Sequence, residues 1–154
     1  MTSFATISIL KFALAAAVST AAITVDIRRR QIPNALSSAL LLLGLGSSAI
    51  SRGWAGFADA LLGATLAFAV FLIPYLLGGM GGGDVKLMAG FGALIGAHGV
   101  LPALILVAVA GTATSILFLT YRWLRGQAFC AAIPYAPAIV IGNLLVAASQ
   151  IGAR

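Results

Sequence analysis

Glutamate is absent from this chain, and charged residues of any kind make up only 8% of its 154 residues, whereas 62% are hydrophobic. A typical soluble domain carries about 25% charged residues. The chain therefore has too little polar surface for an ordinary soluble domain. Its length fits one compact bundle, so we expect residues 1–154 to form a single domain with no second, soluble one.

Cysteine and histidine are almost as scarce, with one of each. Cys130 alone excludes an internal disulfide, and Cys130 with His98 cannot supply the three or four ligands of a zinc site, so we expect no metal and no cofactor. A Ser-His-Asp hydrolase would depend on His98, which has no acid nearby in the sequence. The net charge of +6 does not indicate nucleic acid, because the basic residues lie between apolar runs.

Apolar runs dominate the rest of the sequence. A helix needs roughly 17–25 apolar residues to cross a bilayer, and a shorter run has an uncertain depth. The sequence predicts an all-α, polytopic membrane helix bundle of about six transmembrane helices in a lipid bilayer. A cleaved signal peptide is the alternative for the first run, but Lys11 within it and the missing basic n-region favour a span. The runs are 3–25, 35–50, 57–77, 87–97, 100–120 and 131–150.

The basic residues predict the orientation. Arg28–Arg30, Lys86, and Arg122 with Arg125 fall in the first, third and fifth connections between apolar runs. Alternate connections lie on one side of a membrane, and cytoplasmic connections collect Lys and Arg. We therefore expect a multi-pass protein of the inner (plasma) membrane, with these three connections in the cytoplasm and both termini outside.

The only acids are Asp26, Asp59 and Asp84. In the predicted topology Asp26 and Asp84 both lie at the cytoplasmic face, whereas Asp59 lies at the opposite face, near Arg52. Acids close to a bilayer core normally serve a function or have a partner. Two carboxylates that meet push their titrations apart and share one proton, so one can activate water while the other polarises a peptide carbonyl. The pair predicts a hydrolytic site with a bell-shaped pH profile.

The glycines around Asp84 suit such a site. Gly81, Gly82 and Gly83 have no side chains, so an extended substrate could approach the acid closely. Lys86 could favour the ionised form of Asp84 or hold substrate. A simpler reading makes Asp84 a helix N-cap after a glycine loop. Likewise, Asp26 could pair with Arg29 or Arg30.

Three segments together resemble the type IV prepilin peptidase family. Residues 81–86, Gly-Gly-Gly-Asp-Val-Lys, look like its G-x-G-D signature. Asp26, Arg28 and the sequence Ile32-Pro33-Asn34 resemble its first aspartate segment, and Pro33 and Asn34 are expected to begin the second helix. Residues 133–137, Ile-Pro-Tyr-Ala-Pro, are similar to the opening of its last helix. The three segments occur in the family's order across most of the chain.

The resemblance implies that Asp26 and Asp84 are catalytic and that pilin-like precursors are the substrates. It places cleavage at the cytoplasmic membrane face, after a short basic leader ending in glycine. Larger family members carry a cytoplasmic segment with paired cysteines and methylate the new N-terminus. Because this chain has a single cysteine, we expect peptidase activity without methyltransferase activity, as in short members that process Flp-type pilins. Archaeal preflagellin peptidases resemble it too.

Two other classes of function stay open at this point. A small membrane transporter or channel also uses intramembrane acids, although here no acid lies near the midplane of a predicted span. A noncatalytic assembly partner of a secretion system would not need either aspartate. Asn143 and Gln150 are expected to bond between helices or face a polar cavity, and glycines 63, 90, 96 and 111 are expected to allow close helix contact. The oligomeric state is not predicted.

Overall fold

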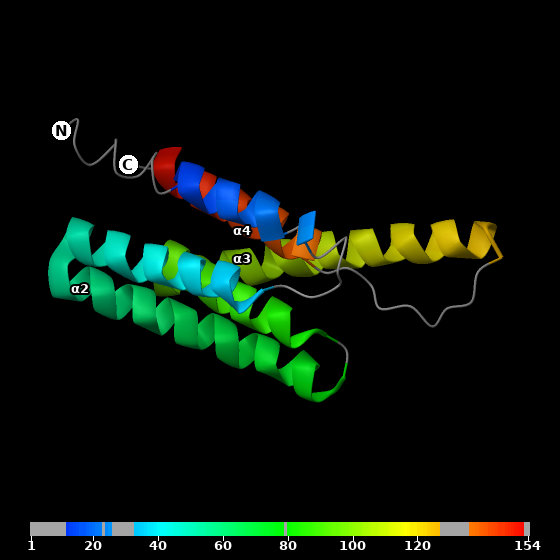
Figure 1. The fold of residues 1–154 in the computed structure, drawn as a ribbon, viewed down its shortest axis with the longest axis horizontal. Helices are drawn as coiled ribbons and strands as arrows, with labels where there is room; N and C mark the ends of the chain where they lie inside the picture. The colour runs from blue at the N-terminus through cyan, green and yellow to red at the C-terminus, as the bar shows by residue number, and fades with distance from the viewer. Residues whose placement is uncertain (1–11, 23, 26–32, 79, 127–135, 153–154) are drawn as a thin grey trace.

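The computed structural model describes residues 12–22, 24–25, 33–78, 80–126 and 136–152. A helix at Phe12–Ala22 comes first. It is followed by α2 (Asn34–Leu76), α3 (Gly82–Leu124) and α4 (Ala136–Gly152), with no strand among the described residues (Figure 1). The all-α expectation is confirmed. By length and composition, α2 and α3 could each cross a membrane, and the count of about six spans stays a prediction.

Both long helices are interrupted by one glycine. Gly53 has φ 60° and ψ −143°, and Gly96 has φ 73° and ψ 172°, a backbone region that essentially only glycine adopts. Each glycine folds its helix back on itself, as Figure 1 shows for α2. We call the parts before and after the glycine the first and second arms: 34–52 and 54–76 in α2, and 82–95 and 97–124 in α3.

The Gly53 reversal is shorter than the sequence indicates. The polar stretch 51–56 separates two apolar runs, but the helix runs to residue 52 and resumes at residue 54, since one glycine suffices to turn the chain. Gly96 allows close helix contact as expected, because a Cβ on Gly63 would lie 2.7 Å from its carbonyl carbon, and it is also the reversal of α3. The reversals lie at the same end of the bundle, because the carboxylate of Asp59 in α2 accepts a hydrogen bond from the backbone N–H of Ala97 in α3 at 3.1 Å.

The first arm of α3 is the central helix of the bundle, and Lys86 is its only exposed side chain. Glycines let its neighbours approach. A Cβ on Gly90 would lie 2.8 Å from the Cβ of Leu40 in the first arm of α2, and a Cβ on Gly92 would overlap the carbonyl oxygen of Gly63 in the second arm. Gly63 and Gly92 thus bring two helix backbones into direct contact, and Gly90 makes room for Leu40. Close helix contact was expected for Gly63 and Gly90.

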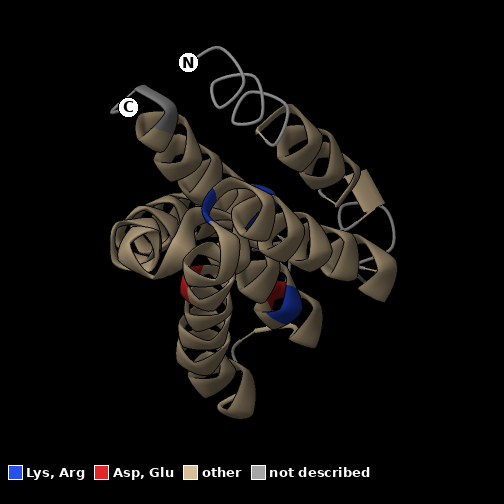
Figure 2. Cartoon of the chain, turned by 90° about the vertical axis from the view of Figure 1, so that its left-hand side faces the viewer, with Lys and Arg blue, Asp and Glu red and all other residues tan. Residues whose placement is uncertain are grey.

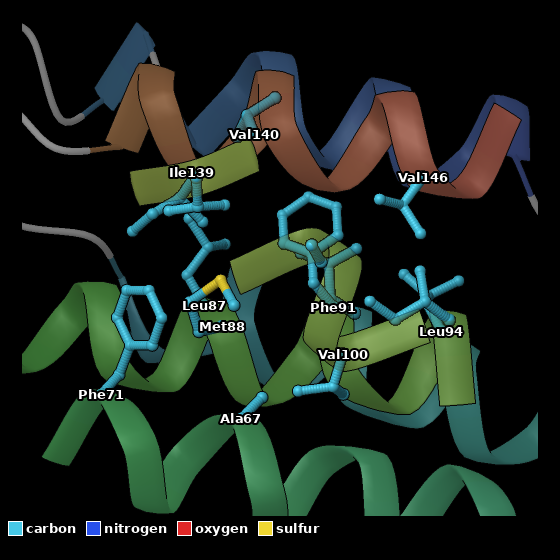
Figure 3. Close-up of a cluster of buried hydrophobic side chains, with 14 of the residues drawn as sticks. Ala67, Phe71, Leu87, Met88, Phe91, Leu94, Val100, Ile139, Val140 and Val146 are labelled. Carbon is cyan, nitrogen blue, oxygen red and sulfur yellow. The ribbon is translucent and has the colours of Figure 1, made fainter. Parts of the chain in front are cut away.

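The apolar core lies around this central arm. Figure 3 shows Leu87, Met88 and Phe91 of α3 beneath Ile139 and Val140 of α4, with Ala67 and Phe71 of α2 on the other side. The helix at Phe12–Ala22 adds Ala15 and Ala22 to the same cluster of buried residues. The outward faces are apolar as well, and Figure 2 shows how few acidic and basic residues the described helices carry. Exposed apolar faces of this extent suit a lipid environment.

Two polar side chains of α4 attach it to the central arm, as expected from the sequence. Asn143 donates from Nδ2 to the sulfur of Met88 at 3.0 Å, and Gln150 donates from Nε2 to the carbonyl oxygen of Ile95 at 2.9 Å. Met88 precedes Ile95 as Asn143 precedes Gln150, so α4 and the first arm of α3 run in parallel. Their N-termini therefore lie at the same end of the bundle, the end opposite Gly96.

Candidate active site

Asp84 is buried in the first turn of α3, with 9% of its surface exposed. Gly81 occupies the N-cap position, and its carbonyl oxygen accepts a hydrogen bond from the N–H of Asp84 at 3.1 Å. The simpler reading of Asp84 as the N-cap residue is therefore wrong. Asp84 is nevertheless an acidic residue in the first turn of α3, near the positive end of the helix dipole.

Part of the glycine run at 81–83 is helical, although the sequence indicates a flexible loop. Gly82 and Gly83 are helical, so α3 begins five residues before the apolar run at 87–97 that predicted it. A Cβ on Gly82 would lie 3.2 Å from the ring of Tyr75, so the end of α2 packs directly on this turn. A Cβ on Gly81 would lie 3.5 Å from Oδ2 of Asp84. Gly81 is exposed, and its missing side chain leaves this approach to the carboxyl group open.

Lys86 and Asn34 join the beginnings of α2 and α3. The ammonium group of Lys86 donates a hydrogen bond to Oδ1 of Asn34 at 2.9 Å. Pro33 is the N-cap residue of α2, which begins at Asn34 as expected. Two residues along a helix amount to about 200° of rotation, so Lys86 lies on the face of α3 opposite Asp84. The expected roles of Lys86, in favouring the ionised form of Asp84 or in holding substrate, stay predictions.

Several predicted site residues lie outside the described residues. They include Asp26, so its distance to Asp84 is not part of the structure. The contact between Asn34 and Lys86 does place the start of α2 beside the turn that carries Asp84. An extended chain spans at most about 3.6 Å per residue, so Asp26 lies within roughly 30 Å of Asn34 along the chain. The other such residues are Arg28–Arg30, Cys130 and the segment 133–135.

Asp59 lies at the end of the bundle opposite Asp84, as the sequence predicted. Its Oδ2 accepts a hydrogen bond from Nη2 of Arg52 at 2.6 Å, and its Oδ1 accepts one from Ala97. Asp59 thereby holds both glycine reversals together and has a structural role away from Asp84. The sequence placed Asp59 near Arg52, whereas nothing in the sequence signalled the bond to Ala97.

His98 does not add to the site at Asp84. It is exposed and lies two residues after the Gly96 reversal, near the helix end where the sequence placed it. Among the described residues there is also no group of three or more His, Cys, Asp or Glu side chains that could hold a metal ion. In the part of the chain described, Asp84 is the only acidic residue at this end of the bundle.

Comparison with known proteins identifies relatives. The profile of the type IV leader peptidase family matches residues 13–116, a range that contains both Asp26 and Asp84. A prepilin leader peptidase/N-methyltransferase of Xanthomonas campestris pv. campestris is 30% identical over 129 residues, which cover 79% of this chain and 44% of the relative. The chain thus matches less than half the length of that relative. No solved structure matches.

Proposed function

The chain belongs to the type IV leader peptidase family, and from this premise we propose that it cuts the leader peptides from pilin-like precursors at the membrane. The observation that carries the proposal is the position of Asp84. This acid is buried at the start of the central helix, at the end of the bundle where α2 and α4 also begin. Three helix N-termini at one end favour negative charge there.

Asp26 is the proposed second acid. It follows the helical residues 24–25 and precedes Pro33, which caps the start of α2. Because Asn34 contacts Lys86, Asp26 is within chain reach of Asp84. An ionised aspartate of the pair would take a proton from water, and its protonated partner would polarise the scissile carbonyl.

The length of the central arm supports cleavage below the membrane surface. The first arm of α3 runs from residue 82 to residue 95, which is about 21 Å at 1.5 Å per residue. The hydrocarbon core of a bilayer is about 30 Å thick. With the Gly96 reversal at one boundary, Asp84, twelve residues away, would lie about 18 Å from it and so inside the hydrocarbon core, in the half nearer the other boundary.

Aromatic residues at the helix ends support a multi-pass arrangement of about six spans. Trp54 is exposed beside the Gly53 reversal and stacks on Phe57 at 5.4 Å between ring centroids. At the other end, the second arm of α3 finishes with exposed Tyr121 and Trp123. Trp and Tyr collect at both boundaries of a membrane. The basic residues Arg122 and Arg125 at the Asp84 end favour the cytoplasmic face of the inner membrane for the active site.

We propose Flp-type prepilins as the substrates and preflagellins as the second choice. The paired cysteines expected of methylating relatives are absent, since Cys130 is the only cysteine. The chain would therefore release the mature pilin without methylating its new N-terminus. Incubation with a prepilin and a labelled methyl donor should give a shortened product that carries no label. A labelled product would overturn this part of the proposal.

Co-expression with a Flp-type prepilin tests the activity, with the size of the precursor followed on a gel. Asp26→Asn and Asp84→Asn should each abolish conversion, because the pair then lacks one carboxyl group. Asp59→Asn is the matched control and should convert the precursor like the wild type. Conversion that survives either of the first two changes would reject the two-aspartate mechanism. If the wild type is present in the membrane but inactive towards all precursors tested, a transporter or an assembly role would replace the peptidase.

A further inference from the structure

Asn143 is the most deeply buried amide of the bundle, with none of its surface exposed. Its Nδ2 donates to the carbonyl oxygen of Ile139 at 2.7 Å and to the sulfur of Met88 at 3.0 Å. Both donor hydrogens of the amide are thus used. These two bonds fix the orientation of the group, so that the atom left over is the carbonyl oxygen Oδ1.

That oxygen, Oδ1 of Asn143, has no hydrogen-bond donor among the described residues. Leaving a buried acceptor without a hydrogen bond destabilises the folded protein. Native proteins normally satisfy such a group with an ordered water that has other polar partners nearby. Among the described residues, Nδ2 of Asn143 already contacts the central arm of α3 at Met88.

Asp84 is the polar group on that side. Met88 follows it by four residues, so both side chains lie on one face of the helix. Methionine side chains in helices lean back towards the helix N-terminus, which brings the sulfur of Met88 beside the turn that carries Asp84. Asn143 contacts this sulfur at 3.0 Å, so its amide lies against the residue one turn after Asp84.

We propose that Asn143 is a positioning residue of the peptidase site, with its carbonyl oxygen accepting a hydrogen bond from the water that attacks the substrate. This inference rests on the proposed function. One hydrogen of the water points to Oδ1 of Asn143, and the carboxylate of Asp84 takes the other. The water oxygen bonds to the peptide carbon while the electron pair of the C=O double bond moves onto the peptide oxygen. When the C–N bond breaks, that electron pair re-forms the C=O bond and the leaving nitrogen takes the proton from Asp84, so that a carboxylic acid and an amine are released and Asp84 is again ionised.

The test compares two amides that both link α4 to α3. Asn143→Leu removes the acceptor at nearly unchanged volume. Gln150→Leu removes the bond to the carbonyl oxygen of Ile95, at the end of the arm away from Asp84. The purified full chain is assayed with a Flp-type prepilin. We expect Asn143→Leu to lower kcat about 10- to 100-fold with KM within about twofold, the size expected for lost positioning. Gln150→Leu should keep kcat within about twofold.

A conservative variant separates positioning from packing. In its neutral form, the carboxyl group of Asn143→Asp keeps a carbonyl acceptor and a hydroxyl that can donate to Ile139. We therefore expect this variant to cleave about 10-fold faster than Asn143→Leu at acidic pH and to lose that advantage as the new carboxyl ionises. If Asn143→Leu fails to accumulate in the membrane, Asn143→Ser replaces it, because its shorter side chain withdraws the acceptor.

The outcomes decide between the two proposals. A wild-type kcat in Asn143→Leu, or an equal loss in Gln150→Leu, would overturn the positioning role while the peptidase activity stands. So would an Asn143→Asp variant that is no faster than Asn143→Leu at any pH. A wild type that cleaves no precursor would overturn the proposed function itself, and the positioning role with it.

Discussion

Arg52 and Asp59 form an ion pair across the Gly53 reversal, with 2.6 Å between Nη2 and Oδ2. The second carboxylate oxygen of Asp59 accepts the N–H of Ala97 just after the Gly96 reversal. One side chain therefore holds the two turns of the chain at the end away from Asp84. This arrangement separates the acid that stabilises the fold from the acid proposed for chemistry.

Asp59 can be tested with two variants of different severity. Asp59→Asn keeps an oxygen for Ala97 and loses only a half-exposed ion pair, which is worth about 0.2–1 kcal/mol. Asp59→Leu also leaves the N–H of Ala97 without its acceptor, at a cost of about 1–3 kcal/mol. Thermal unfolding in detergent should rank wild type, Asp59→Asn and Asp59→Leu in order of falling stability. Equal stability of the two variants would contradict the role of the Ala97 bond.

The pH dependence of cleavage should be bell-shaped. In the proposed pair of Asp26 and Asp84, only the singly protonated form has one base and one acid. On the acidic side both carboxyls become protonated, and on the alkaline side both become ionised. Cleavage rates of the full chain across the pH range check this expectation. A rate that rises to a plateau without falling again would indicate a single titrating group.

Gly63 should tolerate no side chain. A Cβ there would overlap the carbonyl oxygen of Gly92 on the central arm, so Gly63→Ala forces two helices apart at a cost of about 1–3 kcal/mol. Gly46 is the matched control, because a Cβ on this helical glycine meets nothing within 4 Å. Gly46→Ala should be neutral or stabilise by up to about 1 kcal/mol. Unfolding midpoints of the two variants that shift equally would argue against the close contact.

Alanine should destabilise the protein to different extents at the two reversal glycines, Gly53 and Gly96. Both have positive φ, so alanine at either is strained by about 1–3 kcal/mol. A Cβ on Gly53 meets nothing within 4 Å, whereas one on Gly96 would also lie 2.5 Å from Oδ2 of Asp59. Gly96→Ala should therefore lower the unfolding midpoint further than Gly53→Ala. In the Asp59→Asn background, which leaves an atom of similar size there, the difference should persist.

Lys86 should contribute little to cleavage. Its ammonium group is bound by Asn34 on the face of α3 opposite Asp84. We expect Lys86→Met to keep kcat within about twofold and to lose at most about 1 kcal/mol of stability, as for other exposed polar contacts. Asn34→Ala removes the same contact from the other side and should behave alike. A 10-fold loss of kcat in Lys86→Met alone would restore the substrate-holding role.

The sequence predicted the helical class, the membrane character, the start of α2 and the separation of Asp59 from Asp84. These follow from composition and from where polar residues interrupt apolar runs. It missed the first turn of α3, since low helix propensity argued against helical Gly82 and Gly83. That turn is helical because Tyr75 packs on Gly82 and the central arm is buried by its neighbours. Such tertiary contacts are not readable from a local window.

The two glycine reversals also show what a local sequence pattern cannot predict. The polar stretch 51–56 indicated a turn but not its length, because one glycine with positive φ turns the chain as well as a six-residue loop does. In the candidate site, the sequence proposed both aspartates, whose roles stay predictions, and expected Asn143 to bond between helices or to face a polar cavity. The alignment of Asn143 with the turn of Asp84 depends on the parallel packing of α4 on α3, which no local pattern encodes.

The two single-glycine reversals also determine how the interior communicates with its surroundings. The end that contains Gly53 and Gly96 offers no wide connecting loop, and Asp59 draws its two turns together. We therefore expect water, substrate and both cleavage products to exchange with Asp84 through the opposite end or sideways from the lipid. A cut leader peptide would therefore not cross the bundle, and would leave on the side of the membrane from which the precursor came.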